Sequence, residues 1–452
     1  MRKVQLFLAL LFLFLLPVTT SAAPLSEIKA YVEDYYVGEI NGNVQEAKTV
    51  EQVIDMLDPY STYYTAEQFK AFMNAVNMTS VGIGIVIDQH EKGILITDVI
   101  ENGSAFAEGI VSGDIITHIN GKSAAGMTTS NASALILGKE DTTVTLTFLQ
   151  VSGQSVTKTI VRKPFSLPNA TTKLLYGKIG YISLASFSTD AATLVKNGIR
   201  DLTKKGATSF IFDLQNNGGG YVEAAEEVIG LFPHAKVAYT YEDTSGKYTI
   251  YAKRQSVQFP ANTRVLINGY SASASEMTAA ALVDQQAAIL YGEKSYGKGT
   301  MQTFYELSDG SYLKLTMARF AGPTTTTINE IGVQPHIATT GDAIYQAHAD
   351  AIAAQYANYK ELPSLLQVPT TKTFTINFKG VVDTVPEGAI ELVKLGGEAV
   401  ATSVEKQGAK LVVKPTQPLA TGEQYMLLIH PTIKGQGNNT LKKGSYLYIT
   451  VK

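Results

Sequence analysis

The spacing of apolar residues changes along the chain and divides it into segments. In residues 24–57 apolar side chains recur every three to four positions, which is typical of amphipathic helices, and residues 66–76 continue this pattern. Residues 81–87 instead show the pattern of a strand, with two glycines near its start. The spacing therefore predicts a helical N-terminal region, residues 23–76, and then a small β-rich module, residues 77–165.

From Gly177 onward, predicted strands and predicted helices alternate. Such alternation favours parallel strands joined by right-handed crossovers. We therefore expect an α/β core over residues 166–345. Its strands are predicted at 179–184, 209–214, 264–268 and 287–291, and its helices at 189–204, 222–231 and 274–283.

The last part of the chain changes character again. An alanine-rich helix is predicted over residues 343–359, and residues 362–369 resemble a linker, so residues 346–369 are assigned to helix and linker. Residues 370–452 contain short apolar runs separated by Gly and Pro, a pattern typical of an all-β sandwich. We favour a spacer or stabilising role for this tail, with binding to a cell-envelope partner as the alternative.

The first residues have the pattern of a secretory signal. Arg2 and Lys3 precede the apolar run 4–18, and small residues follow up to Ala22, after which we place the cleavage site. Residues 1–22 would then be removed, and the mature protein would be secreted or extracytoplasmic. The alternative is an uncleaved signal anchor that retains the protein, although the run is shorter than the roughly 20 residues of a spanning helix.

Composition excludes several classes of function. Lys and Arg number 37 against 40 Asp and Glu, a net charge of −3, which argues against nucleic acid as a partner. The chain has no Cys, so disulfides, thiolate nucleophiles and Cys-ligated metals are excluded. It also lacks an H-E-x-x-H motif, and we expect neither a metal nor a cofactor.

Unusual residues follow three of the predicted core strands. They are the glycine-rich stretch 215–220, the hydroxyl cluster 271–276 and the Gly-flanked lysine of 292–302. Because parallel strands place their carboxyl ends on one edge, these segments should converge there. A serine at a helix start, loop N–H groups for an oxyanion and a basic side chain together suggest acyl transfer.

A serine nucleophile requires a base, and none of the six His residues lies at these strand ends. Lys298 could serve if its surroundings lowered its pKa from about 10.4 to roughly 7–8, and activity would then be lost below neutral pH. Gln302, four residues further on, is a candidate orienter of that lysine. The structural alternatives are helix-capping serines, a solvated lysine and a flexible glycine turn.

Two motifs favour catalysis over these structural alternatives. Ser271–Glu276 reads SASASE and Tyr296–Gln302 reads YGKGTMQ, and this pair resembles the carboxyl-terminal processing (tail-specific) Ser–Lys proteases, which carry a PDZ domain. The resemblance covers about residues 25–345. It implies that Ser273 is the nucleophile, Lys298 the base and Gln302 its assistant. The stretches Leu57–Ser61 and Ile331–His336 also resemble motifs of this family.

The same resemblance suggests the oxyanion-binding groups. Asn216–Gly220 resembles the glycine loop of the family, with Gly218 where the family usually has Pro. The implied donors are the backbone N–H of Ala274 and that of Gly219 or Gly220.

The β-rich module resembles the PDZ domain of this family, notably over residues 103–114. The resemblance implies that backbone N–H groups of Val81, Gly82, Ile83 and Gly84 bind the free carboxylate of a peptide, which pairs as an added strand. Where this chain has Leu137, the family often has an Arg that is proposed to couple peptide binding to activation. We therefore do not assign this coupling role to Leu137.

These observations predict a multidomain α+β protein: a helical N-terminal region, an inserted PDZ-like β module, an α/β Ser–Lys protease core and a C-terminal Ig-like β-sandwich. The expected function is a secreted serine endoprotease that recognises free, apolar C-termini of protein or peptide substrates and forms an acyl-enzyme. The alternatives are a catalytically idle peptide-binding scaffold of the cell envelope and an esterase. Helical N-terminal regions of such proteins often dimerise, so a homodimer is a further expectation.

Overall fold

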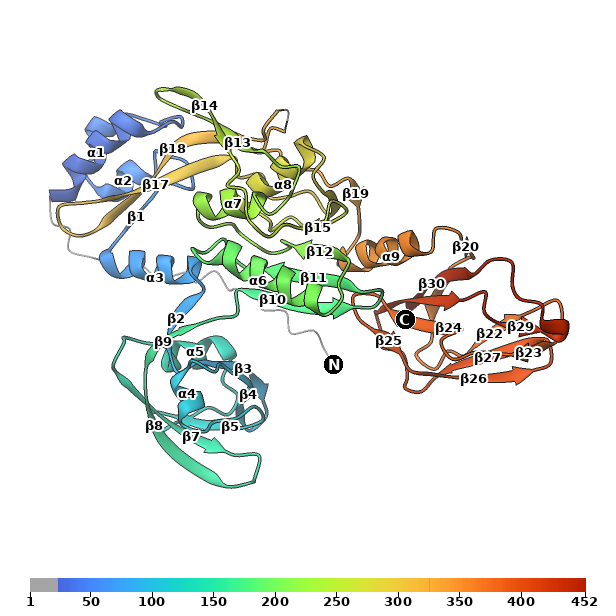
Figure 1. Ribbon diagram of the computed structural model, residues 1–452. Coiled ribbons are helices and arrows are strands. Elements are labelled where there is room, and N and C mark those ends of the chain that lie inside the picture. Colours follow the sequence, from blue (N-terminus) through green and yellow to red (C-terminus); the bar gives the residue numbers. More distant parts are fainter. Residues whose placement is uncertain (1–22, 325) are drawn as a thin grey trace. The chain divides into compact units, whose positions relative to one another are not determined.

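The computed structural model describes residues 23–324 and 326–452, and the predicted signal segment lies outside them (Figure 1). The internal contacts divide the chain into two units. One takes the chain up to Phe69 together with Gln302–Met317, and the other takes Lys70–Met301 and Ala318–Lys452. Within the described ranges, no helix combines the length and the apolar content that crossing a membrane requires.

The first unit contains helices, a short strand and part of a β-hairpin. These are α1 (Ala23–Tyr35), α2 (Val50–Ile54), β1 (Thr62–Tyr64), most of β17 (Thr300–Glu306) and the first part of β18 (Tyr312–Ala321). Ile28 and Val32, one helical turn apart on α1, are buried against Leu313 of β18. The helix predicted from the spacing of Val50, Val53, Ile54 and Leu57 is shorter than expected, since α2 ends at Ile54, and a separate 3₁₀ turn at Val44–Glu46 precedes it. The helix α3 (Ala66–Val76) follows β1.

The β-rich module forms one main sheet with two helices beside it. The sheet has the order β3 (Ile85–His90), β4 (Gly93–Val99), β5 (Ile115–Ile119), β7 (Thr143–Leu149) and β8 (Ser155–Val161), with β6 (Lys122–Ser123) paired to β5. A separate pair joins β2 (Thr79–Gly82) to β9 (Lys163–Ser166), and the helices are α4 (Ser104–Ala107) and α5 (Thr129–Ile136).

The single strand predicted over residues 81–87 was wrong. The chain breaks into β2 and β3 at Gly84, whose φ is +76°, a conformation that favours glycine. A Cβ on Gly84 would lie 2.6 Å from the Cα of Gly103, so the close approach also requires glycine there.

The predicted parallel strands of the core are confirmed. The sheet has the order β10 (Ala170–Leu175), β11 (Ile179–Leu184), β12 (Ser209–Asp213), β15 (Arg264–Ile267), β16 (Ile289–Gly292) and β19 (Ile337–Ala338). Only β10 is antiparallel to its neighbour. The sequence did not predict four further strands. They are β17, β18 and the antiparallel hairpin of β13 (Val237–Asp243) and β14 (Gly246–Tyr251).

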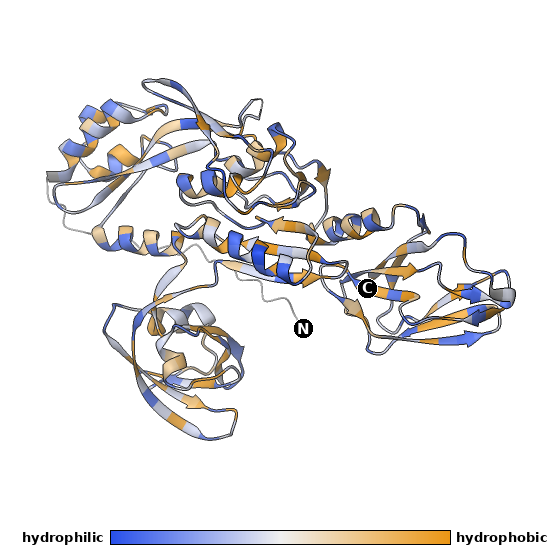
Figure 2. Cartoon of the chain, in the orientation of Figure 1, coloured by the Kyte–Doolittle hydropathy of each residue, from blue (hydrophilic) through white to orange (hydrophobic). Residues whose placement is uncertain are grey.

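Helices cover both faces of this sheet. Phe210 and Phe212 of β12 pack with α6 (Ala191–Lys204), α7 (Val222–Ile229) and α8 (Ala274–Asp284), whereas Ile211 between them packs with α9 (Ile344–Gln355). Burial on both faces explains the nearly continuous apolar character of these strands, which are mostly orange in Figure 2. This three-layer arrangement fixes the positions of the loops at the carboxyl ends of the strands.

The tail folds as a β domain with its own core. Its larger sheet has β20 (Lys360–Glu361), β30 (Ser445–Val451), β28 (Gln424–Ile429), β24 (Ile390–Lys394) and β25 (Ala399–Val400) in that order, and a three-stranded sheet joins β22 (Phe374–Asn377), β27 (Lys410–Pro415) and β26 (Thr402–Gln407). A small pair joins β23 (Val382–Thr384) and β29 (Lys434–Gly435). The expected linker contains β21 (Leu365–Val368), which pairs with β30 because Leu365 and Val368 pack into the apolar core of this domain.

A buried histidine joins α9, the core and the β domain. His348 is fully buried; its Nε2 lies 3.0 Å from the carbonyl oxygen of Tyr176, and its Nδ1 accepts a hydrogen bond from the N–H of Gly396 at 2.9 Å. Burial lowers the pKa of His348 to about 4, so the ring is neutral near pH 7. A neutral ring can donate at one nitrogen and accept at the other, as these two contacts require.

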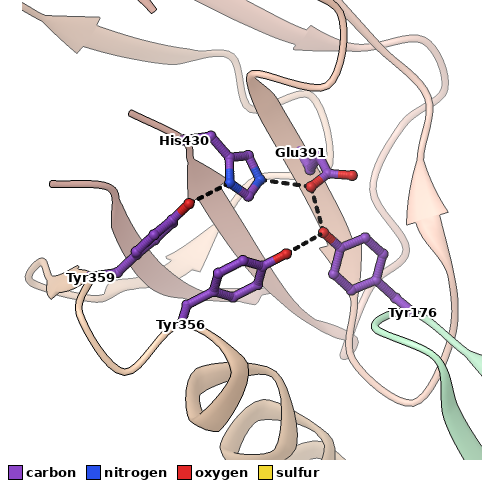
Figure 3. Close-up of polar contacts among 5 residues, drawn as sticks. All are labelled: Tyr176, Tyr356, Tyr359, Glu391 and His430. Carbon is purple, nitrogen blue, oxygen red and sulfur yellow. Dashed lines mark hydrogen bonds and ion pairs between the residues drawn. The ribbon is translucent and has the colours of Figure 1, made fainter. Parts of the chain in front are cut away.

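A second polar cluster lies at the same junction (Figure 3). His430 Nε2 is 2.7 Å from Glu391, and His430 Nδ1 is 2.7 Å from the Tyr359 hydroxyl. The Tyr176 hydroxyl donates to the same carboxylate and is 3.5 Å from that of Tyr356. Burial opposes ionisation of Glu391, but the hydrogen bonds from His430 and Tyr176 hold its pKa below the usual value. The β domain is thus joined to the core by specific polar contacts.

The shifted pKa of His348 predicts a pH-dependent stability. Its folded pKa of about 4 lies below its unfolded value, so the unfolded chain takes up the proton first as pH falls. The stabilisation from this residue should be complete above about pH 6.5 and decline toward pH 4, by about 3 kcal/mol. Urea unfolding of the parent and of His348→Gln across this range measures the difference. His234→Gln, at an exposed histidine, is the control, and a parent-to-variant difference that does not change with pH would contradict the prediction.

Candidate active site

The structure brings the three predicted segments together at the carboxyl ends of β12, β15 and β16. Ser271 Oγ donates to the carbonyl oxygen of Leu214 at 2.8 Å, and Ser275 Oγ donates to that of Asn217 at 2.8 Å. Both serines are fully buried. Ser271 and Ser275 therefore hold the glycine loop, residues 215–220, against the start of α8, which leaves Ser273 as the candidate nucleophile.

Ser273 has an unusual backbone conformation. It is the residue before α8, with φ 55° and ψ −113°, although it carries a side chain. Such a conformation costs about 1–3 kcal/mol and persists only where surrounding contacts impose it. A strained serine at a sharp turn into a helix is typical of nucleophiles that must be presented to a substrate.

Glu276 supplies the contacts that hold Ser273 in place. Its side chain is fully buried, and its Oε2 accepts hydrogen bonds from the N–H of Ser273 at 2.9 Å and from the N–H of Lys298 at 2.8 Å. Its Oε1 accepts from Ser295 Oγ and from the N–H of Gly297, both at 2.6 Å. One carboxyl group thus joins the serine turn to the lysine segment. Sequence reasoning noted Glu276 only as a letter of the SASASE motif, although its place three residues after a helix-capping serine is a recognised signal.

The glycine loop lies directly against Ser273. Gly219 has φ +105°, and a Cβ there would lie 2.9 Å from Ser273 Cβ and 3.0 Å from the backbone nitrogen of Ala274. At Gly220, φ is +148°, and a Cβ would lie 2.3 Å from the carbonyl oxygen of Phe187. Both positions therefore require glycine, whereas a Cβ on Gly218 would meet nothing within 4 Å.

Asn217 shapes this loop from within. It is fully buried, its Nδ2 donates to the carbonyl oxygen of Leu184, and its Oδ1 accepts from the N–H of Gly219 at 2.9 Å. Of the three backbone donors predicted for an oxyanion, Ala274, Gly219 and Gly220, the N–H of Gly219 is thus already engaged in this structure.

Gln302 lies on β17, and Lys298 lies just before that strand. The Gln302 Nε2 donates to Thr316 Oγ1 at 3.1 Å, and the N–H of Thr316 donates to Ser61 Oγ at 3.1 Å. Asp58 in turn accepts the N–H of Ser61 at 2.8 Å. The family-like stretch Leu57–Ser61 therefore supports the strand that faces Gln302, and the role of Gln302 toward Lys298 stays a prediction.

A buried carboxyl group that sequence reasoning missed lies at the base of the glycine loop. Asp213 Oδ2 accepts from the Tyr181 hydroxyl at 2.7 Å, and its Oδ1 accepts from the N–H of Gln215 at 2.8 Å. Burial raises the pKa of Asp213 to about 6, with these hydrogen bonds opposing the shift. Asp213 anchors the start of the loop and was not distinguishable from other strand-end acids by sequence.

The predicted peptide-binding residues separate into two groups. Ile83 and Gly84 line an apolar groove between β3 and α5, together with Ile85, Ile87, Ser133, Ile136, Leu137 and Phe165. Val81 and Gly82 belong instead to β2, which pairs with β9. Leu137 ends α5 and lies in this groove.

A strained serine beside a glycine loop and a lysine segment is typical of the active sites of serine hydrolases. Models of known families agree: "Peptidase family S41" matches residues 178–339, and "PDZ domain" matches residues 72–149.

Two curated relatives extend the match. The chain is 33% identical over 313 residues to "Carboxy-terminal processing protease CtpA" of Bacillus subtilis (strain 168), covering 68% of this chain and 67% of that protein. It is 30% identical over 380 residues to "Probable CtpA-like serine protease" of Staphylococcus aureus (strain N315), covering 83% and 71%. The chain therefore belongs to the carboxy-terminal processing protease family, serine-type peptidases with a PDZ domain.

Among solved structures, the chain is similar to a photosystem II D1 C-terminal processing protease, with 24% identity, a TM-score of 0.46, and coverage of 74% of this chain and 97% of that one. A putative S41 protease from Bacteroides fragilis NCTC 9343 matches with 15% identity, a TM-score of 0.49 and coverage of 74% and 94%.

The four hydrogen bonds to Glu276 predict that stability and peptidase activity both require a carboxyl group at this position. Glu276→Gln would point an NH₂ group at N–H donors that now meet an oxygen, so the variant should lose about 2–4 kcal/mol of stability. Peptidase activity should fall about 100-fold or more, because Ser273 and Lys298 would no longer be held in register. Glu223→Gln, at an exposed glutamate of α7, is the matched control. An active Glu276→Gln enzyme would contradict this role.

The neighbouring residues Gly218 and Gly219 are expected to differ strongly in their tolerance of a side chain. Gly219→Ala should force the loop away from Ser273 and the start of α8, which would displace the backbone donors predicted for an oxyanion, and activity should fall by about 100-fold or more. Gly218→Ala places its methyl group in open space and should cause a far smaller loss. Steady-state cleavage rates, with circular dichroism to verify folding, make the comparison, and equal losses in both variants would refute it.

Proposed function

We propose that the chain is an extracytoplasmic serine endoprotease in which Ser273 is the nucleophile and Lys298 the general base. The observation that carries this proposal is the pair of hydrogen bonds to Glu276 Oε2, at 2.9 Å from the N–H of Ser273 and 2.8 Å from that of Lys298. They hold the backbones of the two residues close together. The side chains of Ser273 and Lys298 therefore start from neighbouring backbone positions, as proton transfer between them requires.

The proposed reaction is a two-step acyl transfer. The uncharged amine of Lys298 takes the proton of Ser273 Oγ, which attacks the peptide carbonyl carbon. The N–H groups of Ala274 and Gly220 hold the oxyanion, and that of Gly219 joins them if its bond to Asn217 opens. Protonated Lys298 then gives its proton to the leaving amine. Lys298 next takes a proton from water, whose oxygen attacks the acyl carbon. The bond to Ser273 Oγ then breaks, Lys298 returns the proton to that oxygen, and the acyl group leaves as a carboxylic acid. Gln302 orients the lysine throughout.

Substrate recognition is assigned to the PDZ domain. The groove lined by Ile83, Ile85 and Ile87 favours an apolar side chain, and a peptide added beside β3 would place its free carboxylate near Gly84. In this proposal the N–H groups of Ile83 and Gly84, between β2 and β3, provide the carboxylate-binding turn, and Val81 and Gly82 at the end of β2 support it. The substrates are proteins or peptides with free apolar C-termini.

The domain boundaries expected from the sequence belong to the same proposal. The tail is assigned an Ig-like architecture and a spacer role, and its sheets begin with β20 and β21, which both pair with β30. The signal pattern of residues 1–22 supports export, with an uncleaved anchor as the alternative. A homodimer and a cell-envelope partner stay predictions.

The test compares the mature protein with Ser273→Ala and Lys298→Ala on an unfolded polypeptide that ends in a free apolar C-terminus. Mass spectrometry should show cleavage by the parent and none by either variant. Because only the uncharged amine accepts a proton, the parent's rate should fall below neutral pH, and a flat profile between about pH 5 and 9 would contradict the lysine base.

Amidation of the substrate C-terminus tests the PDZ assignment in the same assay, and should raise KM. Cleavage by Ser273→Ala would mean that another residue is the nucleophile. Absence of cleavage by all three proteins, with the peptide still bound, would support the peptide-binding scaffold.

A further inference from the structure

Large apolar side chains are exposed beside the candidate nucleophile. Tyr270 is 72% exposed, Tyr296 is 58% exposed and Ile331 is 52% exposed. Tyr270 lies three residues before Ser273, and Tyr296 lies two residues before Lys298. Exposed apolar residues are common when scattered singly, but a group of them beside a site is typical of ligand-binding surfaces.

Backbone hydrogen bonds place these three residues on adjacent segments. The N–H of Tyr296 donates to the carbonyl oxygen of Ser271 at 3.0 Å, which joins its segment to the one that carries Tyr270. On the other side, the N–H of Glu330 donates to the carbonyl oxygen of Gly297 at 2.8 Å, and a Cβ on Gly297 would lie 3.3 Å from the nitrogen of Ile331. The segment of Tyr296 therefore lies between the other two.

The segment that carries Tyr296 is held by the buried Glu276. Ser295 Oγ and the N–H of Gly297, on either side of Tyr296, both donate to this carboxyl group, which also accepts the N–H of Ser273. The backbone of Tyr296 is therefore fixed relative to Ser273, while its side chain is exposed.

Tyr270 is held by a separate set of polar contacts. Its N–H donates to Asn268 Oδ1 at 3.0 Å, and Asn268 also exchanges two hydrogen bonds with Asn216 of the glycine loop, each 3.0 Å long. Its turn is thus fixed to the loop that lies against Ser273. An aromatic side chain on such a fixed turn offers a large apolar contact at low cost in conformational entropy.

We propose that Tyr270, Tyr296 and Ile331 form an apolar ledge that binds large apolar side chains of the substrate next to the scissile bond. This inference rests on the proposed function, because it assigns a substrate preference to the Ser273 site. The ledge acts on residues near the cleaved bond, separately from the PDZ groove, which acts on the C-terminus. It therefore selects unfolded or apolar segments, in which such side chains are accessible.

The test uses the mature full-length protein and an unfolded polypeptide that contains many possible cleavage sites and a free apolar C-terminus. Mass spectrometry ranks the sites cut by the parent, by Tyr270→Ser, by Tyr296→Ser and by Ile331→Ser. We expect the parent to cut preferentially beside large apolar residues. In each variant this preference, measured as the ratio of kcat/KM at apolar sites to that at small polar sites, should fall by about tenfold.

Tyr251→Ser is the matched control, because Tyr251 is 68% exposed on β14 and lies outside the ledge. Its site preference should equal that of the parent. Thermal unfolding verifies that all variants fold, and the conservative changes Tyr270→Phe and Tyr296→Phe should restore the preference.

An unchanged site preference in all three serine variants would overturn the ledge while leaving the protease intact. Failure of the proposed function would give a different result. The parent would then not cleave the polypeptide, or the parent and Ser273→Ala would cleave it at the same rate.

Discussion

The arrangement of the candidate site depends on one buried carboxyl group. Glu276 accepts four hydrogen bonds, and each bond to a carboxylate contributes about 1.5–3 kcal/mol, which together offset the several kcal/mol needed to bury a charge. The single bond to Ser273 is comparable with the strain of about 1–3 kcal/mol in that residue. Since the remaining bonds reach the lysine segment, the same group that maintains the strained serine also sets the position of its proposed base.

The fold supplies the rest of this constraint. Alternate residues of β12 are buried under α6, α7 and α8 on one face and under α9 on the other, so the carboxyl end of the strand has little freedom. Ser271 and Ser275 then fasten the glycine loop to the start of α8, and Asp213 fastens its base. Packing thus provides a rigid edge, and hydrogen bonds along that edge position the groups of the proposed reaction.

Much of this could be predicted from the sequence. Alternating strand and helix patterns predicted the parallel sheet, because a helix that connects two strands of one sheet brings them parallel. The choice of Ser273 among three serines followed only from resemblance, since their burial and partners are tertiary features. The positions of Asp213 and Glu276 were missed for the same reason, because an acidic residue in a motif does not reveal what its oxygens contact. The break at Gly84 was missed because the apolar pattern on both sides of this glycine predicts a continuous strand, and the sequence does not reveal its positive φ.

In the proposed mechanism, Lys298 makes Ser273 nucleophilic. A fluorophosphonate reagent, which modifies activated serines, tests it when the modified peptide is identified by mass spectrometry and the rate is followed against pH. We expect modification at Ser273, at a rate that rises toward neutral and alkaline pH in the parent and is lost in Lys298→Ala. Modification of another residue, or a rate at Ser273 that is the same in parent and Lys298→Ala, would contradict this mechanism.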